Sequence, residues 1–397
     1  MERDLRTILT IQGLRAFLYG FGSVLIGAVL AAGGLSGTAV GAVFTSMLAG
    51  MALASFAMGR LGDRVGRRRA YGGLLLIMGV AGAVFAFTRW IPALVLASLT
   101  GTLSTDPNES GPITSIEQAM LGGAPGAMRA RVFGRYNAVA YLAGSMGALA
   151  AGGPAAFRHL FPALPADQRW LLVFPPLAIA CALLTRRLSP AVEIEDRDRG
   201  VGLVRSRRTV HGLAALFSLD AFAGGFVVQA FLVYWFHQRY GATTAQMGLV
   251  FFGAGLLQAG SSIAAGKIAG RIGLLNTMVF THLPSNALLM AVPFSPVLSG
   301  AVVLLLARSA LSQMDVPARQ AYVVTMVDPS ERVAAAAYTN TARYVTRPAG
   351  PLAAGALLRV ALTGPFLAAG GLKIVYDLVL YRTFRGVALE DPGPLRS

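Results

Sequence analysis

The sequence predicts an all-α membrane protein with twelve transmembrane helices in two six-helix halves. Of its 397 residues, 55% are hydrophobic and 13% are charged, and the mean hydropathy is +0.61. A soluble domain of this size carries about a quarter charged residues. The hydrophobic residues lie in runs of about 20, which is the length that a helix needs to cross the hydrocarbon core of a bilayer.

Twelve such runs follow one another along the chain. In the first half we expect spans at about 9–32, 38–58, 70–88, 93–121, 132–154 and 170–185. In the second half we expect them at about 211–236, 245–266, 273–293, 297–323, 333–358 and 364–381.

Positive charge is unevenly distributed over the connections between these spans. The side that holds both termini and the even-numbered connections carries 23 of the 34 lysines and arginines. The opposite side carries five: Arg89, Arg158, Arg169, Arg239 and Arg359. Because cytoplasmic loops are enriched in Lys and Arg, we expect both termini in the cytoplasm, in a multi-pass protein of the plasma (cytoplasmic) membrane. The net charge of +16 is thus a sign of topology, and no nucleic-acid partner is expected.

The two halves form an internal repeat. Gly147–Gly152 reads GALAAG, and Gly350–Gly355 reads GPLAAG 203 residues later. We therefore expect a first six-helix bundle over 1–185, a cytoplasmic linker over 186–210, a second bundle over 211–381 and a cytoplasmic tail over 382–397.

The connection after the second span carries the most specific motif. Gly59–Arg69 reads GRLGDRVGRRR, with the Asp63-Arg64 pair followed by Gly66 and further arginines. This pattern closely resembles the signature loop between helices 2 and 3 of the major facilitator superfamily, a large family of secondary transporters.

The resemblance implies two parallel repeats that move a substrate by alternating access. It also implies a cytoplasmic gate in which Asp63 docks near the start of span 11. We expect the gate loop to consist of Gly59, Asp63, Arg64, Gly66, Arg67 and Arg68. Asp328, Pro329 and Glu331 have the pattern of a helix start with Asp328 as the N-cap, and we expect them to open span 11.

Charged residues inside the spans are the candidates for function, because each is costly to insert. Span 4 contains Thr105–Pro112, with two prolines and a glycine that should interrupt the helix at a substrate or ion site. Asp106 and Glu109 beside this break are the expected carriers of the coupling proton. If the helix continues, they share one face with Glu117. Asp220 on span 7, which shows no comparable break, is the second choice.

Further charges are expected to line the substrate cavity, since spans 1, 4, 7 and 10 line it in the family. At an offset of 202, Arg308 matches Asp106 and Arg319 matches Glu117, so opposite charges of the two halves could pair across the cavity or hold one substrate between them. The expected cavity charges are Arg15, Glu117, Arg308, Asp315, Arg319 and Arg343. Lys373 and Asp377 on span 12 are interpreted as a local pair, and the four histidines as packing or interfacial residues.

These features predict a secondary transporter and not an enzyme. There is no phosphate-binding glycine-rich loop, so the expected energy source is a proton gradient, with no cofactor and no metal. The expected partners are the lipid bilayer and a small-molecule substrate, and we expect a monomer. Efflux of a small organic molecule is favoured narrowly over uptake of an organic anion such as a carboxylate or phosphate. A non-transporting sensor or scaffold is the alternative of another class.

Overall fold

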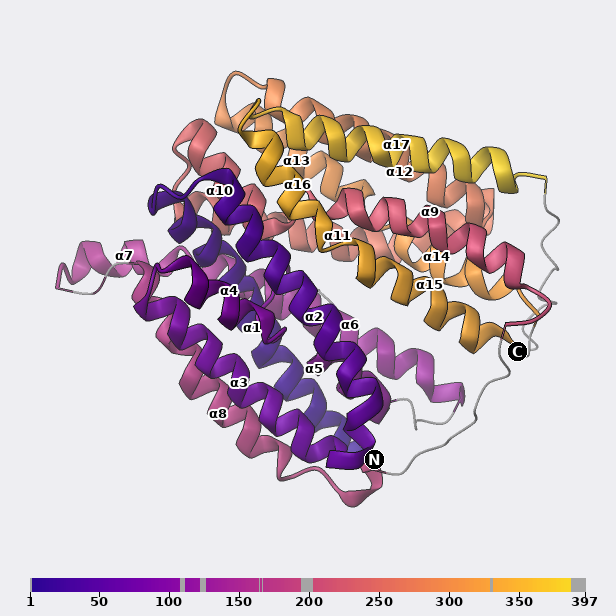
Figure 1. Ribbon diagram of the computed structural model, residues 1–397, viewed down its shortest axis with the longest axis horizontal. Helices are drawn as coiled ribbons and strands as arrows, with labels where there is room; N and C mark the ends of the chain where they lie inside the picture. Colours follow the sequence, from indigo (N-terminus) through magenta and orange to yellow (C-terminus); the bar gives the residue numbers. More distant parts are fainter. Residues whose placement is uncertain are drawn as a thin grey trace. The chain divides into compact units, whose positions relative to one another are not determined.

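The computed structural model describes residues 2–107, 111–121, 126–163, 165, 167–193, 203–328 and 331–386, and its helices are drawn in Figure 1. Within these ranges the chain is almost entirely helical and has no β-strand. The twelve expected spans are present, several of them as two consecutive helices.

The first six spans contain α1 (Glu2–Ala32), α2 (Gly37–Val65), α3 (Arg67–Phe87), α4 (Ile91–Leu99) with α5 (Pro112–Leu121), α6 (Gly126–Ala150), and η1 (Asp167–Val173) with α8 (Phe174–Thr185). A short α7 (Gly153–Leu160) follows α6, and η2 (Pro190–Glu193) follows α8. The other six contain α9 (Arg207–Gly225) with α10 (Gln229–Tyr240), α11 (Thr244–Ile272), α12 (Leu274–Ala291) with η3 (Val292–Phe294), α13 (Leu298–Leu311) with α14 (Asp315–Thr325), α15 (Arg332–Thr346) with α16 (Ala349–Leu358), and α17 (Gly364–Phe384).

Eight of these spans are long and apolar enough to cross a membrane by length and composition alone. The others are spans 4, 5, 9 and 11, among which spans 4 and 11 are divided into two helices. The break in span 4 covers residues 100–111 where these are described, so it is wider than the expected proline-rich stretch.

Span 7 is also interrupted, which corrects the expectation of an unbroken helix. Residues 226–228 separate α9 from α10, directly after Gly224 and Gly225. Two consecutive glycines weaken a helix because glycine loses the most backbone entropy when ordered. The break in span 7 thus has a local sequence signal, although it contains no proline.

The expected loop at Gly59–Arg69 is mostly helical. Helix α2 continues to Val65 and α3 begins at Arg67, so Gly66 alone lies between them. Gly66 has φ +87°, a backbone conformation that residues with a Cβ rarely adopt. The glycine therefore permits a sharp reversal with no loop. The side chains of residues 59–64 lie outside the described set, so the docking of Asp63 at span 11 stays a prediction.

The chain divides into two compact units by its contacts. The first contains Met1–Asp196, Val227–Leu256 and Pro351–Leu362; the second contains Arg197–Phe226, Leu257–Gly350 and Thr363–Ser397. The first unit thus includes α10, the beginning of α11 and most of α16. The division into bundles 1–185 and 211–381 was inferred from the repeat and stays a prediction.

The repeated glycine motif has an equivalent packing role in both copies. A Cβ on Gly147 of α6 would lie 2.0 Å from the carbonyl oxygen of Phe17 on α1. A Cβ on Gly350 of α16 would lie 2.5 Å from the carbonyl oxygen of Phe222 on α9. Span 5 thus approaches span 1, and span 11 approaches span 7, at backbone distances that only glycine permits.

Two glutamates cap helices other than their own. Glu193 accepts hydrogen bonds from the backbone N–H groups of Arg67 (2.6 Å) and Arg68 (3.0 Å) at the start of α3. Glu331 accepts three such bonds at the entry to α9, from the N–H groups of residues 204, 205 and 206 at 2.7–2.9 Å. A carboxylate at a helix N-terminus stabilises the unpaired donors and the helix dipole.

The second cap corrects the expected start of span 11. Helix α15 begins at Arg332, and the N-cap position is Glu331 and not Asp328. The Glu331 carboxylate binds the entry to α9, while Asp328 forms an ion pair with Arg205 at 3.1 Å. The acids of this segment therefore connect two helices of the second unit.

Candidate functional site

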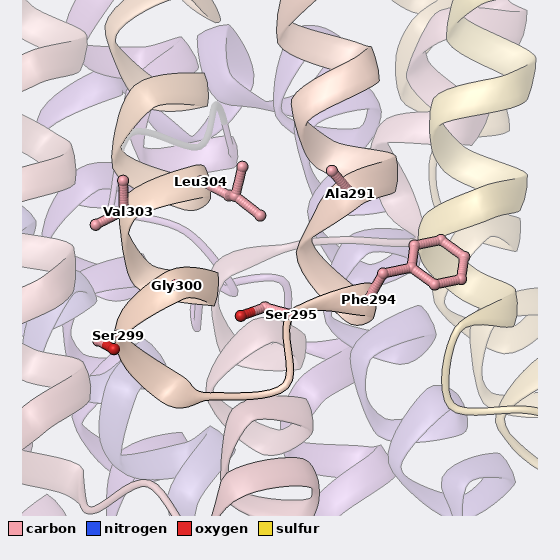
Figure 2. A pocket seen from close by; sticks show the side chains of 7 residues that line it. All are labelled: Ala291, Phe294, Ser295, Ser299, Gly300, Val303 and Leu304. Carbon is pink, nitrogen blue, oxygen red and sulfur yellow. The ribbon is translucent and has the colours of Figure 1, made fainter.

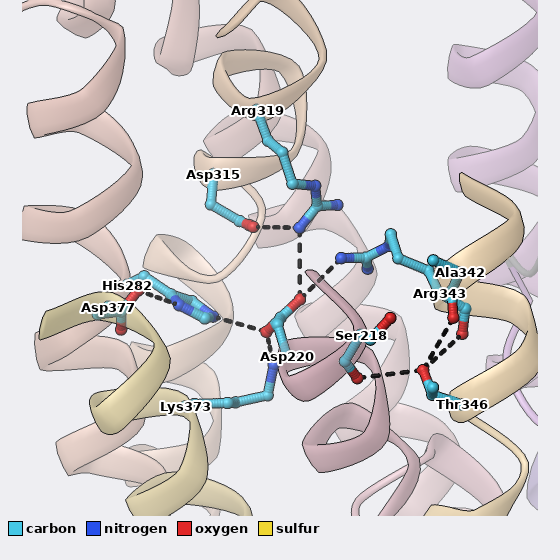
Figure 3. A network of polar contacts seen from close by, with 10 residues as sticks. All are labelled: Ser218, Asp220, His282, Asp315, Arg319, Ala342, Arg343, Thr346, Lys373 and Asp377. Atoms are coloured by element: carbon cyan, nitrogen blue, oxygen red, sulfur yellow. Dashed lines mark hydrogen bonds and ion pairs between the residues drawn. The ribbon is translucent and has the colours of Figure 1, made fainter. Parts of the chain in front are cut away.

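A buried ionic network surrounds Asp220 in the second unit (Figure 3). Asp220 lies on α9, and its side chain is 4% exposed. Its Oδ1 accepts a hydrogen bond from Lys373 Nζ of α17 at 2.5 Å. Its Oδ2 faces Arg343 Nη1 of α15 at 2.9 Å and Arg319 Nη1 of α14 at 3.4 Å. One carboxylate therefore binds cations from three other helices.

Three further contacts surround the arginines of this network. Arg319 Nη1 donates to Asp315 Oδ2 at 2.9 Å, one helical turn earlier on α14, and its guanidinium lies 5.6 Å from the ring centre of Phe217. Thr346, on the same helix as Arg343, donates to the Ser218 carbonyl oxygen of α9 at 3.1 Å. Arg343 is the most exposed of the basic side chains, at 23% compared with 10% for Arg319.

His282 of α12 joins the network from another side. Its Nδ1 lies 2.9 Å from Asp377 Oδ1, and its Nε2 lies 3.9 Å from Asp220 Oδ1. Asn286, one turn further along α12, donates to Asp377 Oδ2 at 3.1 Å. From the sequence this histidine was expected to be a packing or interfacial residue, because the four histidines are scattered without metal-ligand spacing.

The expected pairing of Lys373 with Asp377 is wrong in this structure. Lys373 binds Asp220, and Asp377 binds His282 and Asn286. Both side chains point into the bundle: Lys373 is 7% exposed and Asp377 is 0% exposed as residues. Span 12 thus contributes to the network. We call the following seven residues the Asp220 cluster: Asp220, His282, Asp315, Arg319, Arg343, Lys373 and Asp377.

A second buried network lies in the first unit around Glu117 of α5. Arg15 of α1 donates through Nη2 to Glu117 Oε2 at 2.6 Å. Tyr71 of α3 and Tyr136 of α6 donate their hydroxyls to the two carboxylate oxygens at 2.6 and 2.5 Å. Arg15 also donates to Gln12. Arg15 is 2% exposed and Glu117 is 0% exposed, so both charges are paired and sealed from solvent.

The expected coupling of Glu117 with Arg319 between the halves stays a prediction, because the two residues lie in different units. Each residue binds opposite charge within its own unit. The charges are nevertheless inverted between the repeats. Span 1 carries the cation Arg15 and span 4 the acid, whereas span 7 carries the acid Asp220 and span 10 the cation. The opposite charges at the offset of 202, Glu117 and Arg319, thus each belong to an ion pair within their own unit.

Asp106 lies in the break of span 4 and caps a helix of span 7, α10. Its Oδ1 accepts the backbone N–H of Gln229, the first residue of α10, at 2.8 Å. The Thr105 carbonyl oxygen accepts the N–H of Ala230 at 3.1 Å. Because the helix is interrupted, Asp106 and Glu117 do not share a helical face as expected. Glu109 lies outside the described residues.

Arg308, the remaining expected cavity residue, lies on α13 and is partly buried. The N-terminal part of that helix and the end of α12 form a shallow groove of about 590 Å³, lined by Ala291, Phe294, Ser295, Ser299, Gly300, Val303 and Leu304 (Figure 2). Phe294 and Val303 are 63% and 64% exposed. The groove contains no charged side chain and no member of the Asp220 cluster. Among the described residues, no His, Cys, Asp and Glu side chains group to hold a metal ion.

A model of the Major Facilitator Superfamily matches residues 11–351 of this sequence. The chain belongs to the Major Facilitator Superfamily. It is 24% identical over 430 residues to an uncharacterised membrane protein of Saccharomyces cerevisiae, covering 97% of this chain and 95% of the yeast protein.

Solved structures of the superfamily share its fold. The nucleoside transporter NupG has a TM-score of 0.75 and 14% identity, over 96% of this chain and 99% of that one. A bacterial homologue of the human lysosomal transporter Spinster, inward-facing and occupied, has a TM-score of 0.74 and 14% identity, over 96% and 97% of the two chains. This superfamily member is thus a multi-pass membrane protein and a secondary transporter.

Proposed function

We propose that this transporter is a proton-coupled symporter of a small organic anion and that the Asp220 cluster is its central site. The observation that carries the proposal is the difference in exposure within the cluster. The Arg343 side chain is 23% exposed, whereas Asp220 is 4% and Asp315 is 7% exposed. A substrate that reaches the cluster therefore meets a guanidinium, which binds carboxylate or phosphate well.

The same contacts bear on the choice of proton carrier. Asp106 accepts the backbone N–H of Gln229 at the start of α10, so its carboxylate serves as a helix cap. Asp220 faces three cations, Arg319, Arg343 and Lys373. Both carboxylates are thus engaged in structural contacts, and Glu109 lies outside the described residues. Among the titratable side chains of the cluster, His282 is the one that lies between two carboxylates, Asp220 and Asp377.

Efflux of an apolar or amphiphilic molecule is the alternative to anion uptake. It receives less support, because the exposed member of the cluster is a cation and the apolar groove of α12 and α13 contains none of the expected site residues. On the charge asymmetry of its connections, both termini are assigned to the cytoplasm. The plasma membrane and a monomeric state remain part of the proposal.

The test is uptake by the purified protein in proteoliposomes with an alkaline interior. The labelled probes are lactate and benzoate as monoanions, and uridine and xylose as neutral compounds. We expect at least one anion to accumulate only with the pH gradient. Uptake should fall about tenfold or more in Arg343→Gln, since a hydrogen bond to a charged group contributes about 1.5–3 kcal/mol.

Arg343→Lys retains the charge and separates its loss from misfolding, and Arg359→Gln removes an exposed cation as the matched control. Accumulation of the neutral probes alone would contradict the anion assignment. Proton-driven export of the anions from loaded vesicles would show that the direction of transport is efflux and not uptake.

A further inference from the structure

His282 lies between two carboxylates in the interior of the second unit (Figure 3). The residue is 5% exposed. Its Nδ1 is at hydrogen-bonding distance from Asp377, 2.9 Å, while its Nε2 is 3.9 Å from Asp220 Oδ1 and forms no hydrogen bond there. Because an ionised carboxylate only accepts hydrogen bonds, Nδ1 carries the hydrogen of the neutral ring and Nε2 is the basic nitrogen. A proton added to Nε2 would therefore lie between the imidazole and Asp220.

The charged and titratable groups near this ring come from all elements packed around it. They are Asp220 on α9, Asp315 and Arg319 on α14, Arg343 on α15, and Lys373, Tyr376 and Asp377 on α17. Helix α13, which also packs against α12, has Arg308 as its charged residue. Histidine is the one side chain here whose ordinary pKa, about 6.5, lies in the physiological range.

The charges within the Asp220 cluster are balanced when His282 is neutral. Three aspartates face two arginines and one lysine, so the seven residues have a net charge of zero. Protonation of His282 would change that sum to +1. An unbalanced charge in a buried site is costly, and binding of one negative charge removes the cost.

The two oxygens of Asp220 connect this proton to the exposed arginine. Oδ1 already binds Lys373 at 2.5 Å, and Oδ2 binds Arg343 at 2.9 Å. A protonated Nε2 adds a second positive group at Oδ1 and draws the carboxylate charge away from Arg343. Arg343 is then better able to bind an anion from outside the cluster.

We propose that His282 is the proton-binding site of the transporter, and that one proton on its Nε2 is matched by one monoanion at Arg343. The pair moves with no net charge: the proton leaves Nε2 when the anion leaves Arg343. This assignment rests on the proposed anion symport, and it adds the residue that binds the proton and the ratio of one to one.

The experiment is an NMR titration of the protein labelled with ¹⁵N-histidine in lipid nanodiscs. The chain has four histidines, so the His282 signals are identified by their loss in His282→Gln. Spectra are recorded from about pH 8 to pH 5, and we expect the doubly protonated form of His282 to appear within this series. In Asp377→Asn, which keeps an acceptor for Nδ1 and removes the charge, we expect the doubly protonated form to be lost from the series. His211→Gln, which removes an exposed histidine, is the control that should leave the His282 titration unchanged.

A His282 ring that stays neutral over this range in the wild type would overturn the proposal, as would an identical titration in Asp377→Asn. Proton-driven anion uptake by a protein with a silent His282 would refute this inference and leave the proposed function intact. A titrating His282 in a protein that transports none of the four probes would leave the proton site standing and contradict anion symport.

Discussion

The buried pair of Arg15 and Glu117 gives the sharpest test of how charge stabilises the first unit. Glu117→Gln removes one charge with little change in side-chain volume. The glutamate accepts hydrogen bonds from Arg15, Tyr71 and Tyr136 at 2.5–2.6 Å and has no exposed surface. A glutamine has a single carbonyl oxygen for these donors, and its amide group faces another donor.

The expected loss follows from the environment of the remaining charge. With Glu117 neutral, the Arg15 guanidinium is a buried cation whose remaining hydrogen-bond partners, Gln12 and Tyr136, carry no negative charge. Removal of one partner of a buried pair costs about 3–5 kcal/mol of unfolding free energy. This is a large fraction of the stability of a typical protein, about 5–15 kcal/mol.

The measurement is the free energy of unfolding in mixed micelles for four proteins: wild type, Arg15→Gln, Glu117→Gln and the double variant. The double variant should recover about 0.5–3 kcal/mol relative to the sum of the singles, since it leaves no unpaired charge. The matched control is Glu2→Gln, which breaks an ion pair with Arg6 whose side chains are both 77% exposed. That pair should contribute about 0.3–0.5 kcal/mol. If Glu117→Gln costs no more than Glu2→Gln, or if the singles simply add, the electrostatic reasoning is wrong.

Three further predictions concern other parts of the chain. Asp106→Asn keeps an oxygen for the α10 N–H and should retain both stability and proton-driven uptake. Asp106→Ala removes the cap and should lower the free energy of unfolding by about 0.5–2 kcal/mol. Lost uptake with intact substrate exchange in Asp106→Asn would restore Asp106 as the proton carrier. The backbone hydrogen bonds of residues 206, 205 and 204 lower the pKa of Glu331 below its ordinary value of 4.5. The stabilisation by this carboxylate is therefore full above pH 4.5 and is lost as the pH falls through the lower pKa of the folded state. Thermal melts in acid should show a smaller pH dependence in Glu331→Gln, and an unchanged dependence would exclude this cap. In a cysteine-free background, cysteines placed at Ser36 and Ala163 should react with an impermeant thiol reagent from outside. A cysteine placed at Val65 should react only from the cytoplasm. The opposite labelling would overturn the positive-inside assignment.

The spans could be predicted from the sequence because their signals are local. A run of apolar residues long enough to cross the bilayer ends where charge begins, and α12 at Leu274–Ala291 agrees closely with the expected 273–293. The prolines of Thr105–Pro112 likewise predicted the break in span 4, since a proline removes a backbone donor wherever it lies. The two copies of the glycine motif indicated a repeat, and their close backbone contacts explain why both copies keep glycine.

The sequence also identified most charged members of the two networks, because any charge inside an apolar run is conspicuous. It could not assign their partners. Lys373 and Asp377 are one helical turn apart and could pair by helix geometry alone. Only the packing of α17 against α9 and α12 brings Lys373 to Asp220 and Asp377 to His282. For the same reason His282 was missed: a lone histidine has no local pattern.

What the sequence by itself determined was therefore the set of helices, the break in span 4 and the presence of buried charge, all of which depend on residues near one another in the chain. What the tertiary structure alone decided was which charges meet. Glu117 binds Arg15 over 102 positions, and Asp220 binds Lys373 over 153. Ion pairs act over a few ångströms, so the rotation of each helix about its axis selects among several partners of suitable charge. That rotation is set by the packing of whole helix faces, which no short stretch of sequence specifies.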